Sequence, residues 1–369
     1  MQIALQIAAW VIGILAVLIL LLYFVGGYYL YRLAIKRDDK RQNKCWELPL
    51  GKRDEESDED FARMKEGEAL VKGRLAEFVT ITSRDGLKLS ARVYEHPDAR
   101  GMFLMVHGYR SSSLGDFSGA IKSVYDMGYS LFLIDQRGHG RSEGGNICFG
   151  SFERYDVVDW ANYIKERWPG LPVVMDGVSM GSGTVMLACG VGYPDNVRAI
   201  IADCGYTTPG AICRDVLRKH MHIPAFPVYY GGRLWTKLLA KYDLDKVSVP
   251  DALRSLTDTS LYPKPIPILI AHGRKDGFVP YAMSEENVKS LEDKDGHVLP
   301  FAEFFTSEEA DHGMSFLKDY DGYMAAIGRL FDKAGLPHDK VEEEEFVPET
   351  PIDQLTREDA DSGMIYTIN

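Results

Sequence analysis

The sequence predicts an α/β protein in which a mostly parallel sheet is covered by helices on both faces. Two features predict this class. Two short alternating runs, 78–82 and 87–94, are joined by Arg84-Asp85-Gly86, and Asp-Gly between such runs is typical of a β-hairpin. After the hairpin, buried-strand runs alternate with helical segments. This alternation is typical of parallel strands that are linked by helices.

The elements of this domain, which we expect to span 77–336, are placed one by one. Apolar runs predict six strands after the hairpin, at 102–106, 130–134, 172–175, 199–202, 266–271 and 300–305. Helices are expected at 117–127, 152–168, 180–191 and, closing the domain, 314–334. The strands after the hairpin are therefore expected to join the sheet by parallel pairing.

The alternation breaks once, between the strand ending near Asp203 and the one starting at Ile266. These about 60 residues are far more than an ordinary connection needs. Helical pieces are expected at 207–220 and 232–241, with a patch between them that is rich in proline and aromatic residues (Pro224, Phe226, Pro227, Tyr229 and Tyr230). We interpret the insertion, about 205–262, as a small helical cap over the strand ends.

Residues 1–31 predict a single transmembrane anchor. Residues 3–31 hold no ionisable side chain except tyrosines, and 8–25 are almost wholly apolar. At about 1.5 Å per residue, roughly 20 such residues cross a ~30 Å hydrocarbon core. A cleaved signal peptide would need a basic start and a shorter apolar run, whereas no Lys or Arg precedes this one. Trp10 and the tyrosines near Tyr28 are expected near the two interfaces.

The segment that follows, 32–76, predicts the orientation of the anchor. It begins with the basic residues Arg32, Lys36, Arg37, Lys40, Arg41 and Lys44. The positive-inside rule then places the catalytic domain in the cytoplasm, at the cell membrane. Residues 53–68 are dense in charge and are interpreted as a solvated stalk that runs into a short helix. Cys45 lies just beyond the membrane, where an ordinary thiol is favoured over a lipidated one.

Composition and charge exclude several classes. Of 369 residues, 46% are hydrophobic and 26% charged, which excludes wholesale disorder. The net charge of −12 argues against nonspecific nucleic-acid binding. The tail, 337–369, carries most of this charge and is predicted to be acidic and disordered. Five scattered cysteines without a C-x-x-C pair predict reduced, mostly buried thiols and no metal site.

The strongest motif is Gly177-Val178-Ser179-Met180-Gly181. It matches G-x-S-x-G, follows a buried strand and opens a helix, which is the context of a nucleophile elbow. The serine sits on a tight turn, and residues two positions away approach too closely for side chains, so Gly177 and Gly181 are expected on both sides.

A serine nucleophile needs a histidine base and a carboxylate that orients it. Asp276 follows the strand 266–271, and His312 follows the strand 300–305, so both lie at carboxyl ends of strands, where α/β sheets form their sites. Asp203 is the rival acid because it also ends a strand. His220 and His222 form an H-x-H pair in the cap, which is favoured as solvated or packed rather than metal-binding.

The oxyanion needs preorganised donors. One is expected to be the backbone N–H of Met180, at the start of a helix, and the other the N–H of Tyr109, in the loop after the strand 102–106. His107 and the loop 135–142 are interpreted as structural. The cap aromatics Tyr229, Tyr230 and Trp235 are candidates for lining an apolar acyl or aryl pocket.

With these motifs in place, residues 78–334 resemble the α/β-hydrolases. The resemblance is greatest to membrane-anchored bacterial serine hydrolases of the serine-aminopeptidase-like and monoglyceride-lipase-like branch. It rests on motifs in the family order, at 107–109, 135–142, 177–181, 273–280 and 310–315. The resemblance implies an eight-stranded sheet with a helical cap and the triad of Ser179, Asp276 and His312.

The sequence therefore predicts a serine hydrolase that cleaves carboxylic esters through an acyl-enzyme, without a cofactor. Its expected partners are a small or lipid-like ester and the membrane, and not nucleic acid. Peptidase, thioesterase or deacylase activity uses the same triad and stays open. A non-catalytic membrane scaffold that binds through the acidic tail is the alternative from another class.

Overall fold

The computed structural model describes residues 1–38, 57–74 and 76–341. Its centre is one eight-stranded sheet of order β1-β2-β4-β3-β5-β6-β7-β8. The hairpin strands β1 (Glu77–Thr82) and β2 (Lys88–Tyr94) pair antiparallel, and β2 pairs antiparallel with β4. The pairs from β4 onward are parallel. The remaining strands are β3 (Gly101–Val106), β4 (Tyr129–Ile134), β5 (Val173–Val178), β6 (Val197–Asp203), β7 (Ile268–Gly273) and β8 (Ala302–Ser307). The predicted fold class is confirmed.

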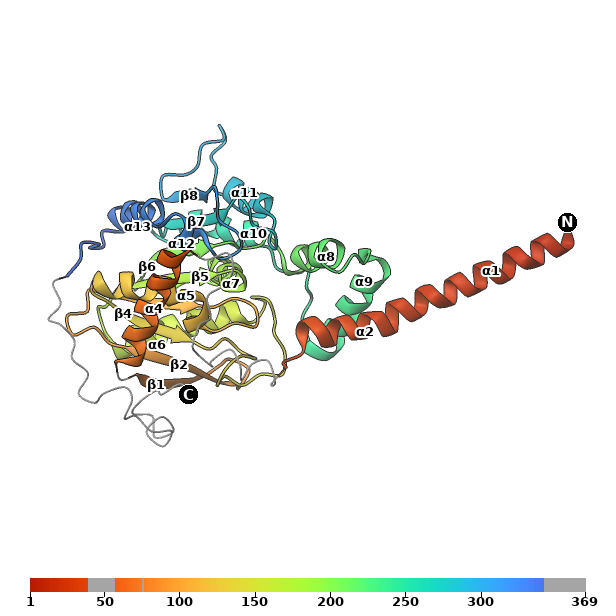
Figure 1. Cartoon of the computed structure of the whole chain (residues 1–369), viewed down its shortest axis with the longest axis horizontal. Helices are drawn as coiled ribbons and strands as arrows, with labels where there is room; N and C mark the ends of the chain where they lie inside the picture. Colours follow the sequence, from red (N-terminus) through yellow and green to blue (C-terminus); the bar gives the residue numbers. More distant parts are fainter. Residues whose placement is uncertain (39–56, 75, 342–369) are drawn as a thin grey trace.

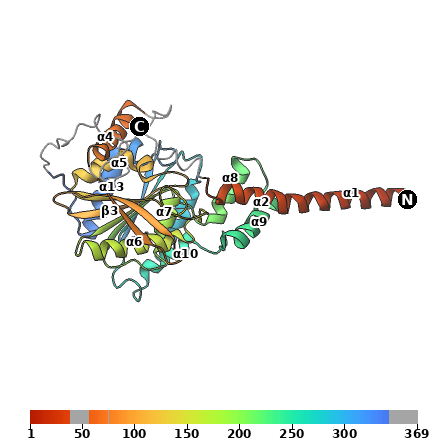
Figure 2. The ribbon, with the colours of Figure 1, turned by 90° about the horizontal axis from the view of Figure 1, so that it is seen from below.

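Helices cover both faces of the sheet (Figures 1 and 2). The helices on one face are α4 (Asp58–Lys72), α5 (Ser113–Asp126) and α13 (Tyr320–Ala334). Those on the other are α6 (Glu153–Arg167), α7 (Met180–Ala188), α10 (Val249–Arg254) and α11 (Tyr281–Lys289). Because side chains alternate along a strand, β3 supplies both cores. Phe103 and Met105 join the first, and Leu104 joins the second.

Two helix predictions differ from the structure. The closing helix is divided into α12 (Ser315–Lys318) and α13, because Asp319 leaves helical geometry at φ −139 and ψ 62. The aromatic patch of the cap is not a linker between helices. Apart from Pro224, the N-cap residue, it lies in α9 (Ala225–Trp235), which follows α8 (Pro209–Lys219) and leads into the π-helical turn η4 (Thr236–Ala240).

Helix α4 corrects the expectation of a solvated stalk. Its first turn is closed by a capping box between Ser57 and Asp60. Met64 is only 4% exposed, and the buried Asp60 carboxylate accepts a hydrogen bond from Lys318 Nζ at 2.7 Å. A Cβ on Gly67 would lie 1.9 Å from the carbonyl oxygen of Ser118 in α5. The helix is therefore packed against the domain and not held away from it.

Replacing Gly67 with valine is expected to push α4 away from α5, because the added carbon meets backbone that has no room to move. We expect the free energy of unfolding to fall by about 1–3 kcal/mol. Limited proteolysis within α4 should accelerate in the same variant. Ala69→Val is the matched control, since Ala69 is exposed on the same helix. Equal resistance of the two variants would contradict the packed position of α4.

The N-terminal segment is a continuous helical run, Gln2–Ile35, of 34 residues with a mean hydropathy of 2.8 in its most apolar window. By length and composition it is able to cross a membrane. Its first part, α1 (Gln2–Leu21), has no buried residue and projects away from the body (Figure 1). The later turns, η1 (Leu22–Gly26), α2 (Gly27–Leu30) and η2 (Tyr31–Ile35), pack against α9 and η4 of the cap.

Some predictions fall outside the described residues. Lys40, Arg41, Lys44 and Cys45 lie there, as does most of the acidic tail, 342–369. Among the described cysteines, Cys148, Cys189 and Cys204 are buried and Cys213 is partly buried, all as free thiols. The prediction of mostly buried, reduced thiols is confirmed for these four.

Candidate active site

The turn after β5 has the backbone strain expected of a nucleophile elbow. Ser179 has φ 56 and ψ −113, an unfavourable conformation for a residue with a side chain, and α7 begins at the next residue. A Cβ on Gly177 would lie 2.5 Å from the carbonyl oxygen of Gly181, and one on Gly181 would lie 1.8 Å from that of Val106. Only glycine fits at either position. The resulting tight turn places Ser179 at the carboxyl end of β5.

The structure brings together the three residues predicted for the triad. His312 Nε2 lies 2.9 Å from Ser179 Oγ, and His312 Nδ1 lies 2.7 Å from Asp276 Oδ2. The three side chains come from the loops after β5, β7 and β8, at the carboxyl ends of parallel strands. The Asp276 side chain is fully buried, whereas that of His312 is 24% exposed. The chain of hydrogen bonds therefore runs from the protein interior to an accessible hydroxyl.

The surroundings of Asp276 keep it ionised. Burial opposes the charge, but hydrogen bonds from His272 and His312 outweigh it, and the pKa of Asp276 lies well below its ordinary value. Its other oxygen, Oδ1, accepts from the backbone N–H groups of Phe278 and Val279, each at 2.8 Å. For His312, burial lowers the pKa but the bond to Asp276 raises it more, so the net shift is upward. The carboxylate is thus suited to stabilise an imidazolium.

A second histidine at the acid was missed by the sequence analysis. His272, fully buried in β7, places its Nε2 3.0 Å from Asp276 Oδ2 and 3.1 Å from the carbonyl of Val279. Its Nδ1 lies 2.6 Å from Ser284 Oγ. One carboxylate oxygen is therefore shared by two imidazoles, which fixes the Asp276 side chain. The spacing His272-x-x-x-Asp276 within a strand-to-loop segment was the available signal.

The rival acid, Asp203, occupies another position, and so does Asp311, which neighbours His312 in the chain. Asp203 is buried and accepts from Ser315 Oγ at 2.9 Å, and burial raises its pKa. Asp311 Oδ1 accepts from the backbone N–H groups of Gly277 and His312, both at 2.8 Å. Neither carboxylate bonds to His312 Nδ1, which is hydrogen-bonded to Asp276.

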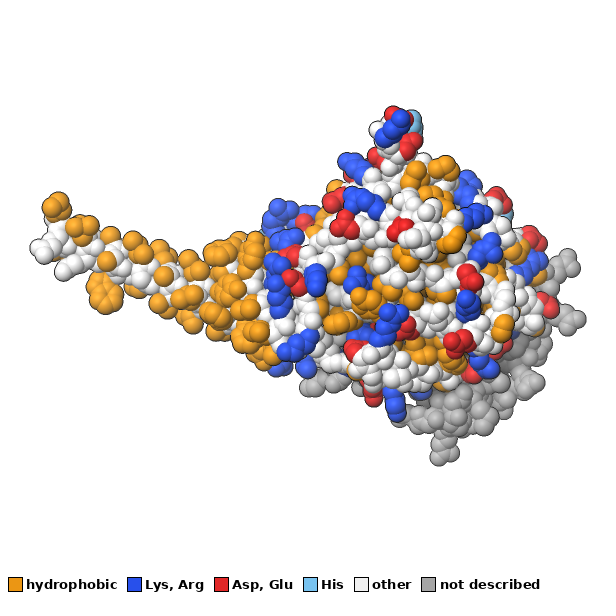
Figure 3. Space-filling model, turned by 180° about the vertical axis from the view of Figure 1, so that it is seen from behind, with side chains coloured by type: hydrophobic (Ala, Val, Ile, Leu, Met, Phe, Trp, Pro, Cys, Tyr) orange, Lys and Arg blue, Asp and Glu red, His pale blue; other side chains and the backbone are white. Residues whose placement is uncertain are grey.

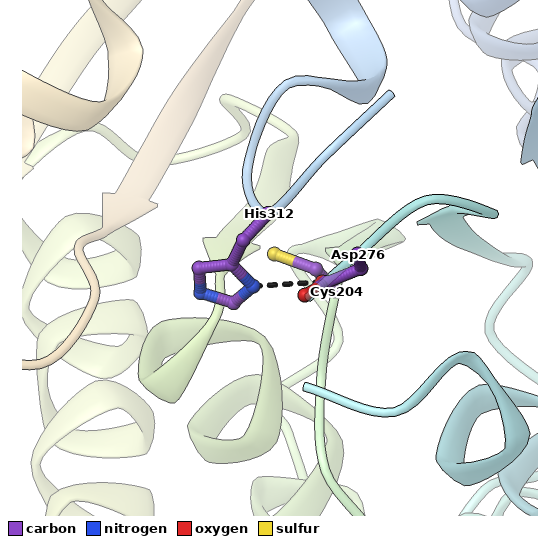
Figure 4. Close-up of side chains that lie close together, drawn as sticks. All are labelled: Cys204, Asp276 and His312. Carbon is purple, nitrogen blue, oxygen red and sulfur yellow. Dashed lines mark hydrogen bonds and ion pairs between the residues drawn. The ribbon is translucent and has the colours of Figure 1, made fainter. Parts of the chain in front are cut away.

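Cys204, Asp276 and His312 offer ligand atoms that lie within 4.8 Å of one another (Figure 4). Figure 4 shows the Asp276 and His312 side chains bonded to each other, with the Cys204 sulfur beside them. Burial raises the pKa of the Cys204 thiol well above its ordinary value. Metals bind cysteine as the thiolate, and the raised pKa keeps the Cys204 thiol protonated. These residues therefore suit a hydrogen-bonded Asp276–His312 pair beside a thiol better than a metal site. The expectation of no metal stays a prediction.

The loop after β3 approaches the nucleophile, as the oxyanion hypothesis requires. A Cβ on Gly108 would lie 3.3 Å from Ser179 Cβ, and the Gly108 N–H donates to Asp116 Oδ2 at 2.6 Å. Tyr109 follows in this loop. Met180 is the first residue of α7, so its N–H has no partner within the helix. The assignment of the Tyr109 and Met180 N–H groups as oxyanion donors stays a prediction.

Two buried histidines support this loop through hydrogen bonds. His107 Nε2 accepts from the Gln136 N–H at 3.1 Å, so its Nδ1 carries the proton and donates to the Gly108 carbonyl at 2.8 Å. His139 Nε2 accepts from the backbone N–H of Arg110 at 3.0 Å. The structural interpretation of His107 and of the loop 135–142 is confirmed.

A cavity of about 260 Å³ opens beside Ser179 and Met180. Its lining is almost entirely apolar and comes from α8, the loop after β7 and the anchor helix. The predicted pocket residues are not in this lining. Tyr229 is buried and donates to Asp245 Oδ1 at 2.8 Å, Trp235 Nε1 donates to the Phe24 carbonyl at 2.8 Å, and Tyr230 is 45% exposed. The prediction that they line the pocket is wrong, because Tyr229 bonds within the cap, Trp235 bonds the cap to the anchor, and Tyr230 lies on the exposed surface of the cap.

A second, more polar cavity of about 190 Å³ meets Ser179 and His312 from the side of α5. Three carboxyl groups line it, those of Asp116, Asp176 and Asp203. Burial, together with the nearby Asp203, raises the pKa of Asp176 to about 8. The nucleophile therefore lies where two cavities meet, an almost wholly apolar one and one that also contains carboxyl groups.

Comparisons with known proteins agree with this geometry. Residues 97–225 match the family model described as serine aminopeptidase, S33. A monoacylglycerol lipase of Mycolicibacterium smegmatis is 24% identical over 232 residues, covering 54% of this chain and 79% of the lipase. The uncharacterized protein YqkD of Bacillus subtilis is 23% identical over 236 residues, covering 64% of this chain and 72% of that protein.

A solved structure has the same fold. An esterase from Pyrococcus furiosus superposes with a TM-score of 0.54 at 19% identity, covering 72% of this chain and 93% of the esterase. The chain therefore has the α/β-hydrolase fold, and its similarities to a serine aminopeptidase model and a monoacylglycerol lipase support the serine-aminopeptidase-like and monoglyceride-lipase-like branch.

Proposed function

We propose that this protein is a membrane-anchored serine hydrolase that cleaves carboxylic esters through an acyl-enzyme. The observation that carries the proposal is the chain of hydrogen bonds from Asp276 through His312 to the strained Ser179. The relative named as a monoacylglycerol lipase supports the ester bond as the target. The apolar cavity at Ser179 suits an acyl chain.

In the proposed reaction, Ser179 Oγ attacks the ester carbonyl while His312 Nε2 takes its proton. The developing oxyanion is held by the backbone N–H groups of Tyr109 and Met180. His312 then returns the proton to the leaving alcohol, which departs and leaves Ser179 acylated. Water attacks this acyl-enzyme with the same base, and the acid product leaves. Asp276 stabilises the imidazolium in both halves.

The anchor and its orientation are part of the proposal. The proposed single span is residues 1–31, which lie almost entirely in the helix Gln2–Ile35. The basic residues Arg32, Lys36 and Arg37 follow the apolar run, so the positive-inside rule puts the catalytic domain in the cytoplasm.

A fluorophosphonate probe tests the function, because it reacts only with an activated serine. We expect the full chain in detergent micelles or vesicles to be labelled at Ser179 and to hydrolyse p-nitrophenyl esters. A folded protein that takes up no label would contradict the proposal and favour the non-catalytic scaffold.

The pH dependence follows from the raised pKa of His312. The base acts only when neutral, so kcat/KM should fall about tenfold per pH unit below this pKa. Since Asp276 raises the pKa, we expect the midpoint of the acid limb above pH 6.5. A pH–rate profile with p-nitrophenyl butyrate measures it. A midpoint below 6 would contradict the Asp276–His312 coupling.

Peptidase activity is the second candidate, because the matching family model is described as a serine aminopeptidase. Amino-acid p-nitroanilides with a free amino group, compared with p-nitrophenyl esters, separate the two activities. Thioesters of the same acyl groups test the thioesterase alternative in parallel.

A further inference from the structure

The end of the anchor helix is fastened to the loop that carries the proposed oxyanion donor. Tyr109 Oη donates to the carbonyl of Ala34 at 2.9 Å, and Arg110 Nη2 donates to the carbonyls of Leu33 and Lys36 at 2.8 and 3.0 Å. These bonds satisfy carbonyls that a helix C-terminus otherwise leaves unpaired. The anchor thus ends within the site and not on a free linker.

The anchor also packs closely against cap helix α9. A Cβ on Gly27 would lie 2.4 Å from the backbone of Gly231, and one on Gly231 would lie 1.7 Å from the Tyr23 carbonyl. Backbones approach this closely at membrane helix interfaces through small residues. At about 1.5 Å per residue, Tyr23 lies roughly 12 Å before Tyr31, the end of the proposed span. Helix α9 therefore reaches the depth of the last turns of the anchor.

The cap presents an apolar surface beside these turns. The cap surface consists of exposed side chains from α9 and η4, namely Phe226, Tyr230, Leu238 and Leu239, which are 45–58% exposed. Figure 3 shows the orange surface of the anchor broadening at its base, with Lys and Arg side chains next to it. The insertion 205–262 holds eight Lys and Arg against five Asp, a net +3 in a chain of net −12. Apolar contacts framed by positive charge suit an anionic bilayer surface.

The apolar cavity lies between these two elements. Leu30, Leu33 and Ala34 of the anchor and Ile212 and Val216 of α8 line it, together with Ser179. Leu33 is 38% exposed, so it stands at the rim. A chain that runs from Ser179 past Leu33 follows the anchor toward the bilayer.

We propose that the anchor helix is a wall of the acyl-chain site and that the enzyme takes a long-chain amphiphilic ester from the bilayer that holds it. This inference rests on the proposed ester hydrolase function and on the membrane span. The acyl chain lies against Leu30 and Leu33, and the ester carbonyl reaches Ser179. A soluble ester arriving from water is the alternative source that the experiment separates.

The first test places a larger side chain at the rim of the cavity. It uses the full chain, reconstituted in vesicles of phosphatidylglycerol and phosphatidylethanolamine. Leu33→Trp should lower the ratio of kcat/KM for p-nitrophenyl laurate to that for the butyrate by about tenfold. Tyr29→Trp is the matched control, since Tyr29 is 68% exposed on the same helix and outside the cavity lining. The same ratio in Leu33→Trp, Tyr29→Trp and wild type would overturn the anchor wall.

The second test addresses the source of the substrate. Leu238→Glu with Leu239→Glu places charge on the cap surface, outside the cavity lining. We expect turnover of vesicle-dissolved laurate to fall about tenfold relative to soluble butyrate. An unchanged ratio would overturn the bilayer source. Fluorophosphonate labelling of each variant separates the failures, because an unlabelled wild type contradicts the proposed function itself, whereas labelled variants with unchanged selectivity contradict only this inference.

Discussion

Ser179→Ala is expected to lose ester hydrolysis almost completely, with kcat lower by about 10⁵- to 10⁶-fold. The hydroxyl lies at the head of the hydrogen-bond chain through His312, where it is positioned to attack. The variant should fold, because removing one oxygen from a half-buried side chain leaves the strained turn and its glycines intact. Hydrolysis of p-nitrophenyl butyrate and fluorophosphonate labelling measure the effect.

Ser182→Ala is the matched control for this variant. Ser182 lies one turn further along α7, is fully buried, and its hydroxyl has no hydrogen-bond partner among the described residues. Its loss should therefore leave labelling and turnover close to wild type. Labelling that survives in Ser179→Ala would mean that another residue is the nucleophile, and the proposed mechanism would fall.

Asp276→Asn is expected to lower kcat by about 10⁴-fold, the scale known for loss of the acid in a serine triad. The amide removes the charge that raises the pKa of His312. It also replaces a carboxylate that accepts hydrogen bonds from both His272 and His312 with a group that has one acceptor oxygen and one NH₂ donor group. The remaining activity should show its acid limb at lower pH than wild type, because His312 loses its stabilising partner. Steady-state kinetics across pH measure both effects.

Asp203→Asn tests the rival acid. Asp203 is buried, bonds to Ser315, and has a raised pKa. The amide is close to it in shape, so we expect less than a tenfold change in kcat. A loss as large as that of Asp276→Asn would move the role of the acid to Asp203. Thermal unfolding of both variants controls for loss of structure.

Much of this site was predictable because its constraints are local. The elbow is a short-range steric pattern, in which Gly177 and Gly181 are required by backbone atoms within a few residues or on the neighbouring strand. Asp276 and His312 were found because each follows a strand, and parallel strands end at one edge of the sheet. The hairpin and the alternating runs likewise gave the eight strands, since the period of side chains along a strand is short.

The features that were missed depend on which distant surfaces meet. An apolar or aromatic residue is compatible with a pocket, a core or a helix interface, so composition alone did not separate Trp235, which supports the anchor, from Leu33, which lines the cavity. The charged run before β1 suggested a stalk, yet Gly67 and Met64 find a complementary face on α5. His272 shares Asp276 only because β7 and its loop fold back on each other. The sequence thus specified the reacting groups through local geometry, while long-range packing determined their surroundings and the shape of the substrate cavity.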